Sequence, residues 1–281
     1  MKITRFQRLN QIVLVAETGD RFFDISSVPS GFSDMRALLS HPDPVAAVDD
    51  VLTRASELTL TDDFRIARPL DIQEVWASGV TYFRSKIARI GESVGGRAFY
   101  DKVYAADRPE LFFKSAASRV AGHLQPVRIR RDSTWNVPEP ELALVLSSSG
   151  RIVGYSIGND MSSRSIEAEN PLYLPQAKVY DASCSLGPRI LLANEDKAPE
   201  GISMTVERAG TEVFSGDTST SKIRRPLQEL ADYLFSEMSF PDGVFLLTGT
   251  GIVPPEDFSL QSGDVIKITI DGIGTLENPV A

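Results

Sequence analysis

From about residue 70 to its end, the chain is divided into short apolar segments by glycine, proline and asparagine. Such segments, only a few residues long and rich in branched side chains, are typical of β-strands between turns. The strands that we expect here lie at residues 142–146, 152–157, 190–192, 204–208 and 265–270. The pattern predicts a mostly β architecture for the larger part of the protein, interrupted by one clear amphipathic helix over residues 227–238.

The first 70 residues show a different pattern of apolar residues. Two short strands, at residues 12–16 and 21–25, flank a turn, and apolar residues then recur at helical spacing over residues 45–58. We therefore place a domain boundary near residue 70. The predicted fold class is α+β, with a small α/β domain over residues 1–70 and a β-rich domain over residues 71–281.

Charge and cysteine content exclude several classes of protein. With 38 acidic and 29 basic residues the net charge is −9, which repels nucleic acid and anionic membranes. Cys184 is the only cysteine, so no internal disulfide can form and a reducing, cytoplasmic location is expected. The apolar run at residues 12–16 is far shorter than a signal core or a membrane span. We expect no nucleic-acid partner and no membrane contact.

One predicted strand carries two acidic residues at its start. In the stretch VPEPELALVL, Glu139 and Glu141 are two apart and therefore share a face, with Cα atoms roughly 7 Å apart. Two such glutamates most often lie at a solvated strand end, but this strand is apolar on both faces, where unpaired carboxylates are costly. Asp160 ends the next apolar strand and offers a third carboxylate. The alternative for Asp160 is a turn or a helix cap.

Three hard oxygen ligands favour Mg²⁺, with Mn²⁺ or Ca²⁺ as weaker alternatives. Zinc sites and histidine-dependent catalysis are disfavoured, because the two histidines lie in unrelated contexts. Lys178 and Lys114 each lie among apolar residues. A lysine in such surroundings can exchange a proton near neutral pH, and Lys178 is the stronger candidate for acid–base work.

Five ordered stretches together resemble the fumarylacetoacetate hydrolase superfamily: PELFFKSAASRVAG, PEPELALVL, VGYSIGNDMSSRS, QAKVYDASCSLGP and TGTG with the C-terminal LQSGDVIKITIDGIGTLENPV. The resemblance implies a β-rich roll with a divalent-metal site, a smaller N-terminal domain and assembly into a homo-oligomer, a dimer or a tetramer. It places the metal ligands at Glu139, Glu141 and Asp160, the motif lysine at Lys178 and the threonine of the glycine-rich loop at Thr250.

Within this superfamily the chain resembles the 2-keto-3-deoxy-D-arabinonate dehydratase branch, through SGVTYFRSKIAR and EAENPLYLPQAKVYDASCSLGP. Hydrolytic members of the superfamily resemble an Asn-Tyr-x-x-His pattern, and the corresponding residues 81–85 of this chain read TYFRS. The histidine that activates water in those members is therefore absent. The branch implies Glu110 as a second catalytic carboxylate beside Lys178, and Lys114 and Arg84 join Thr250 as candidate substrate contacts. The implied reaction is Mg²⁺-dependent dehydration of a 2-keto-3-deoxy sugar acid to 2,5-dioxopentanoate through an enolate.

Two alternatives to the dehydratase remain open. The first is an acylpyruvate hydrolase, decarboxylase or isomerase acting on another 2-keto acid, because the same enolate chemistry serves all of them. The second is a sugar-acid-binding protein without catalysis.

Overall fold

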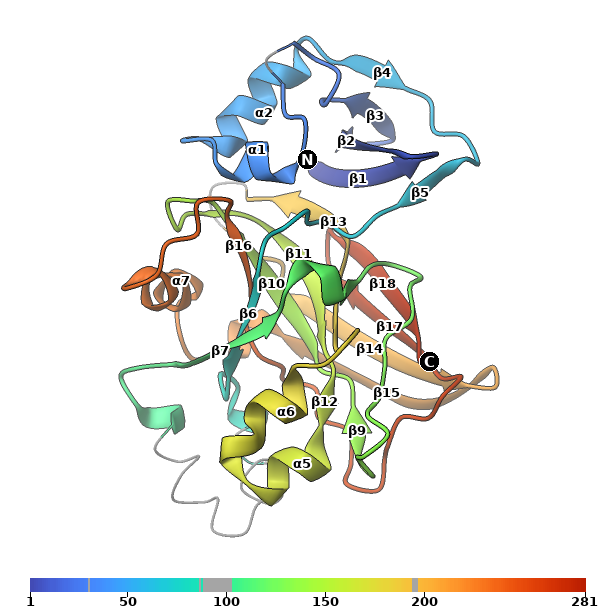
Figure 1. Ribbon diagram of the computed structural model, residues 1–281, viewed down its shortest axis with the longest axis vertical. Helices are drawn as coiled ribbons and strands as arrows, with labels where there is room; N and C mark the ends of the chain where they lie inside the picture. Colours follow the sequence, from blue (N-terminus) through green and yellow to red (C-terminus); the bar gives the residue numbers. More distant parts are fainter. Residues whose placement is uncertain (30, 86, 88–102, 194–196) are drawn as a thin grey trace.

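The computed structural model describes residues 1–29, 31–85, 87, 103–193 and 197–281. Most of its regular structure is β-sheet, and short helices lie at the periphery (Figure 1). This is the expected α+β fold with a predominantly β larger part. In the described part of the chain, every helix is too short or too polar to cross a bilayer.

The N-terminal part forms the upper layer of Figure 1, where five strands and two helices pack together. These elements are β1 (Lys2–Arg8), β2 (Gln11–Thr18), β3 (Arg21–Asp24), α1 (Met35–Leu39), α2 (Pro44–Leu52), β4 (Ser56–Leu58) and β5 (Phe64–Ile66).

The larger part begins with β6 (Val75–Gly79), β7 (Glu110–Ser115), η1 (Ala117–Arg119), β8 (Val120–Ala121), β9 (Asn136–Val137), β10 (Pro140–Leu146) and β11 (Ile152–Asp160). Next come β12 (Ser162–Ser163), α5 (Arg164–Glu169), η2 (Pro171–Tyr173), α6 (Leu174–Lys178) and β13 (Cys184–Leu192). The chain ends with β14 (Gly201–Arg208), β15 (Thr211–Ser219), η3 (Thr220–Lys222), α7 (Leu227–Phe235), β16 (Val244–Leu247), β17 (Val265–Ile270) and β18 (Gly274–Pro279).

One large sheet runs through both parts, in the order β4-β3-β2-β1-β13-β11-β10-β16-β6-β7, with β5 beside β1 and β8 beside β13. A second sheet has the order β15-β14-β17-β18, and β9 pairs with β12. The N-terminal strands join the rest because Lys2 and Ile3 of β1 pair with β13. The division into domains near residue 70 therefore remains a proposal, with residues 67–74 as the connection.

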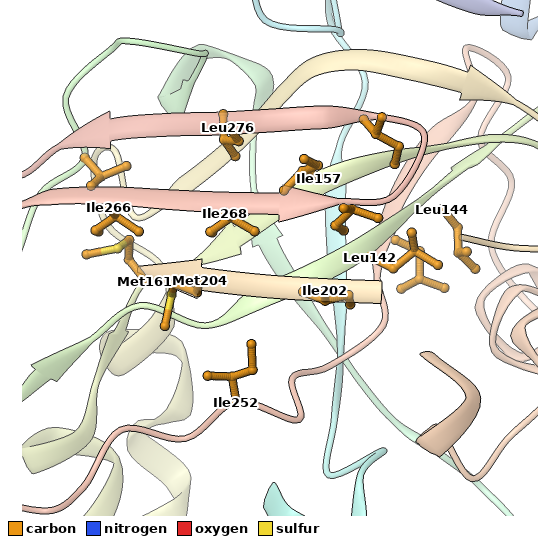
Figure 2. Packing of buried hydrophobic residues seen from close by; sticks show 14 of the residues in the cluster. Leu142, Leu144, Ile157, Met161, Ile202, Met204, Ile252, Ile266, Ile268 and Leu276 are labelled. Carbon is orange, nitrogen blue, oxygen red and sulfur yellow. The ribbon is translucent and has the colours of Figure 1, made fainter. Parts of the chain in front are cut away.

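The main core lies between the large sheet and the four-stranded sheet (Figure 2). Leu142 and Leu144 of β10 belong to it together with Ile202 and Met204 of β14, and Leu142 lies near Ile202. The alternate residues Ala143 and Val145 of β10 belong to a second core on the other side of the sheet. β10 is thus buried on both faces, as its uninterrupted apolar sequence predicts.

The helix expected over residues 45–58 is shorter than predicted. It starts at Pro44, where the Asp43 side chain accepts from the N–H of Ala46 at 3.3 Å, and it ends at Leu52. Residues 56–58 form β4 instead, because Leu58 pairs with Phe22 of β3 and the hairpin gains a further strand. Sheet pairing overrides the helical spacing here. The C-terminal helix likewise stops at Phe235 rather than at residue 238.

Candidate metal centre and active site

Strand pairing brings the three predicted carboxylates together. Glu139 directly precedes β10, Glu141 lies in it, and Asp160 is the last residue of the neighbouring β11. In this antiparallel pair Glu141 is opposite Gly158, and the Asp160 N–H donates to the Glu139 carbonyl at 2.9 Å. The register therefore places the end of one strand beside the start of the other.

The three carboxylates converge on one point. One oxygen from each of Glu139, Glu141 and Asp160 lies within 4.8 Å of the others, and the three residues are only 1–3% exposed. In the described part of the chain, no other cluster of three histidine, cysteine or acidic side chains has this geometry. Buried carboxylates this close repel one another unless cations compensate them.

Two buried basic side chains contact Glu139. The Lys178 Nζ lies 2.6 Å from Glu139 Oε2 and 3.0 Å from Asp160 Oδ2, and it donates to Ser162 Oγ at 2.6 Å. Arg164, the first residue of α5, places Nη2 2.6 Å from Glu139 Oε1. Each oxygen of Glu139 is therefore held by a different cation, which fixes the plane of its carboxylate.

Glu141 is compensated less completely. Its Oε2 accepts the Gly249 N–H at 2.5 Å. Burial raises the pKa of the Glu141 carboxyl well above its ordinary range, and the negative charges of Asp160 and Glu139 raise it further. Three buried carboxylate oxygens that repel one another and converge on one point fit a small, hard dication, so the donor set suits Mg²⁺.

We expect Mg²⁺ to stabilise the protein more at about pH 8 than at about pH 5.5. The raised pKa means that the metal-free folded state holds a proton on Glu141 that the unfolded state has released, above the unfolded value of about 4.3. Without metal, the folded protein therefore loses stability as the pH rises from about 5.5 to about 8, because its buried Glu141 is harder to ionise than that of the unfolded chain. Bound Mg²⁺ would remove this loss by stabilising the ionised carboxylate. Thermal unfolding with and without MgCl₂ checks this. KCl at matched ionic strength is the control, and an equal shift at both pH values would contradict the expectation.

A cavity opens beside the three carboxylates. Its lining includes Lys178, Glu110 and Thr250 together with the carboxylates themselves. Two predicted substrate contacts are placed elsewhere. Arg84 is exposed and is not among the lining residues, and Lys114 is fully buried behind Asp160. The structure thus gathers six of the eight predicted site residues around one cavity.

Glu110 reaches the cavity because its neighbour on the next strand has no side chain. Glu110 starts β7 and pairs with Gly79 at the end of β6. A Cβ atom at Gly79 would lie 2.0 Å from Glu110 Oε2 and 2.5 Å from its Cδ. Only glycine therefore leaves room for the carboxylate in this position.

The Gly79→Ala variant should lose about 10²-fold in turnover, because the new methyl group displaces the Glu110 carboxylate by the order of 1 Å. The expected effect disappears in a Glu110→Ala background, where the carboxylate that the methyl group would displace is absent. A double-mutant cycle on kcat measures this coupling. Additive losses for Gly79→Ala and Glu110→Ala would mean that the glycine acts independently of the carboxylate.

Several residues of the site were not identified from the sequence. Arg164 lies four residues after Asp160, and Ser162 lies between them; both are buried and contact the cluster. Gly249 supplies a backbone N–H, and Glu167 of α5 lines the cavity. Three buried carboxylates require more than one cation, and this requirement could have directed attention to the arginine in the motif NDMSSRS.

Most residues of this site lie in a part of the chain that matches a known protein family. A family model described as fumarylacetoacetate (FAA) hydrolase C-terminal matches residues 87–281. The chain belongs to the fumarylacetoacetate hydrolase family. The match contains all three carboxylates, Lys178 and Thr250, whereas residues 78–80 and Ser85 of the cavity lining precede it.

Two curated proteins are especially similar to this chain. The 2-dehydro-3-deoxy-D-arabinonate dehydratase of Saccharolobus solfataricus is 46% identical over 224 residues, which cover 78% of this chain and 75% of that protein. A Haloferax volcanii protein named "Probable 2-keto-3-deoxyxylonate dehydratase" is 48% identical over 236 residues, covering 80% and 81% of the two chains.

A solved structure has a similar fold over the whole length of this chain. It is a 2-keto-3-deoxy-D-arabinonate dehydratase complexed with magnesium and 2,5-dioxopentanoate. The two structures align with a TM-score of 0.85 at 36% identity, over 100% of this chain and 98% of the other.

Proposed function

We propose that this protein is a Mg²⁺-dependent hydro-lyase that removes water from a 2-keto-3-deoxy sugar acid of the 2-keto-3-deoxy-D-arabinonate type, forming 2,5-dioxopentanoate. The observation that carries the proposal is the buried trio of Glu139, Glu141 and Asp160 beside Lys178 and Glu110 in one cavity. The 46% identity to a dehydratase of such an acid supports the choice of substrate.

The trio would hold Mg²⁺, which when bound supplies positive charge that polarises the 2-keto group and acidifies the protons on C3. Dehydration then requires one group that removes a C3 proton and one that protonates the departing C4 hydroxyl. The unsaturated 2-keto acid that results becomes 2,5-dioxopentanoate when a C5 proton is removed, C3 is protonated again and the enol so formed ketonises. We assign these proton transfers to Lys178 and Glu110. Both line the cavity, and they come from different elements, α6 and β7.

Thr250 is proposed to bind the substrate carboxylate. It lies 4% exposed in the cavity lining, in the loop after β16, next to the glycine whose N–H holds Glu141. Among the residues that the structure describes, its hydroxyl donates to the Ile252 carbonyl at 3.3 Å and accepts the Ile252 N–H at 3.2 Å. These long hydrogen bonds are weak, so the hydroxyl can turn toward an anionic ligand at little cost.

The cavity favours dehydration over hydrolysis. Hydrolytic members of the superfamily resemble an Asn-Tyr-x-x-His pattern, and Ser85 stands here in place of the histidine. Ser85 lines the cavity and donates to the Tyr82 carbonyl at 2.8 Å. A serine engaged with the backbone cannot act as a base toward water, so attack of water on a carbonyl lacks its catalyst at this position.

Product analysis tests the proposed reaction. The purified protein is incubated with Mg²⁺ and a panel of 2-keto-3-deoxy pentonates and acylpyruvates, and products are identified by mass. We expect a product lighter by one water from a pentonate, and no cleavage of an acylpyruvate. Carbon–carbon cleavage or CO₂ release would favour the hydrolase or decarboxylase alternative. Tight Mg²⁺-dependent binding without any product would indicate a binding protein.

Proton exchange assigns the two catalytic groups. In D₂O, 2-oxopentanoate can exchange its C3 protons at the site but has no C4 hydroxyl to lose. The group that acts as base is the one whose removal, by Lys178→Met or Glu110→Gln, stops this exchange in NMR spectra. Removal of the other group leaves exchange intact and stops dehydration only.

We further propose that the protein works as a homo-oligomer, a dimer or a tetramer, in the cytoplasm. The resemblance to the superfamily supports the first statement. The single cysteine, which is buried and free, supports the second, since it needs no oxidising compartment. Light scattering of the purified protein would measure the oligomeric state.

A further inference from the structure

Lys114 is a buried cation that lies outside the cavity. Its side chain is 0% exposed, and it is not among the residues that line the cavity. It belongs to β7, the strand that also contributes Glu110 and Phe112 to the lining. A buried ammonium is costly unless oxygen atoms surround it, so the identity of those oxygens indicates its role.

Three oxygen atoms lie close to the ammonium group of Lys114. Its Nζ forms an ion pair with Asp160 Oδ1 at 2.6 Å and donates to the Met161 carbonyl at 3.0 Å. It also donates to the carbonyl of Lys178. Two of its three N–H donors therefore go to backbone carbonyls, and its charge is paired with Asp160 outside the cavity lining. All three acceptors belong to the proposed metal ligand, to the residue after it, or to the proposed catalytic lysine.

The backbone of β7 is irregular at this residue. Phe113 pairs with Trp76 and Ser115 pairs with Val75, so Lys114 is the extra residue in the ladder between β6 and β7. An extra residue of this kind is a β-bulge, and it turns a side chain away from the face that it would have in a regular strand. Here the irregularity directs Lys114 to Asp160 on β11, a strand that is not adjacent to β7 in the sheet.

Asp160 is consequently held from two sides. Lys114 contacts its Oδ1 and Lys178 contacts its Oδ2. Lys114 also holds the backbone of Lys178, whose carbonyl receives a second hydrogen bond from Ser183 Oγ at 2.9 Å. One ammonium thus fixes the distance between the carboxylate of Asp160 and the peptide that carries the Lys178 side chain.

We propose that Lys114 is a positioning residue that orients Asp160 for the metal and Lys178 for proton transfer, without touching the substrate. This inference rests on the proposed function of the same site. It assigns to Lys114 a role different from the substrate contact that its sequence context predicts. Groups that orient metal ligands in this way typically affect metal affinity or activity by about 10–100-fold.

The test compares Lys114→Met, which keeps the length of the side chain and removes its charge, with Arg5→Met. Arg5 is the matched control because it is another buried cation that contacts one carboxylate, Asp71, and two carbonyls, those of Arg68 and Leu70, away from the cavity. Both variants lose a buried ion pair and both should unfold at a lower temperature. Only Lys114→Met should also change the metal site.

For Lys114→Met we expect the dissociation constant for Mg²⁺, measured by calorimetry without substrate, to rise about 10–100-fold. At saturating Mg²⁺, kcat should stay reduced by at least about 10-fold, because Lys178 is also displaced, whereas KM changes much less. If Lys114→Met does not fold, Lys114→Gln, which keeps amide donors for the two carbonyls, should show the same losses.

Mg²⁺ affinity and kcat equal to those of the wild type, in whichever of these variants folds, would overturn the proposal. So would losses no larger than those of Arg5→Met. The metal titration needs no substrate, so it still tests Lys114 if the wild type binds Mg²⁺ but does not dehydrate the pentonates. That last result would refute the proposed function alone.

Discussion

The Glu141→Gln variant is expected to lose about 10³-fold or more in turnover and most of its Mg²⁺ affinity, yet to fold at least as stably as the wild type without metal. The loss in turnover corresponds to about 4 kcal/mol, the several kcal/mol that a catalytic metal contributes. The amide oxygen of glutamine can still accept the Gly249 N–H, so the local structure is retained.

The stability of this variant follows from the cost of the native carboxylate. Burial and the charges of Asp160 and Glu139 raise the pKa of Glu141, so a neutral amide relieves a repulsion that the metal-free protein otherwise carries. Calorimetric Mg²⁺ titration, kcat and thermal unfolding in EDTA measure the three effects. Glu212→Gln on the exposed face of β15 is the control. Unchanged Mg²⁺ affinity in Glu141→Gln would remove this residue from the metal site.

The Lys178→Met variant is expected to keep Mg²⁺ and 2-keto acid binding and to lose about 10³-fold in dehydration, within the usual range for a proton-transfer group. Without metal it should also lose about 3–5 kcal/mol of stability, because Glu139 Oε2 and Asp160 Oδ2 lose a buried cation that lies 2.6 Å and 3.0 Å away. Mg²⁺ should restore most of this loss, since it replaces the missing positive charge.

Calorimetry with Mg²⁺ and 2-oxopentanoate, turnover assays and unfolding with and without metal separate these effects. Lys267→Met is the control, because Lys267 forms a partly exposed ion pair with Glu207 at 2.7 Å, outside the cavity lining. Dehydration at the wild-type rate in Lys178→Met would exclude the lysine from the mechanism. Loss of Mg²⁺ binding would instead make it a structural part of the metal site.

Much of the fold was predictable because strand signals are local. The apolar run in β10 predicted a strand buried on both faces, and the structure has Leu142 and Ala143 in the two different cores. The residues around β4 were predicted wrongly as helix, because apolar spacing cannot reveal that Leu58 pairs with Phe22, 36 residues earlier in the sequence. The pairing of β1 with β13 was equally invisible, since it joins segments almost 190 residues apart.

The site was predictable where residue type and strand period sufficed. Glu139 and Glu141 share a face by alternation alone, and the structure brings Asp160 beside them through the register of β10 and β11. The surroundings of Lys114 could not be predicted. A lysine near apolar residues is expected either at a surface or in a pocket, and only the irregular pairing of β7 turns this one toward Asp160.

Buried charges of both signs meet at the carboxylate trio. Glu139, Glu141 and Asp160 lie there with Lys114, Lys178 and Arg164. Little solvent screens the charge that a divalent ion would add at this position. An open-chain acid offers that ion a carboxylate, whereas the neutral lactone of the same acid offers none. We therefore expect the site to select the ring-opened form of the acid.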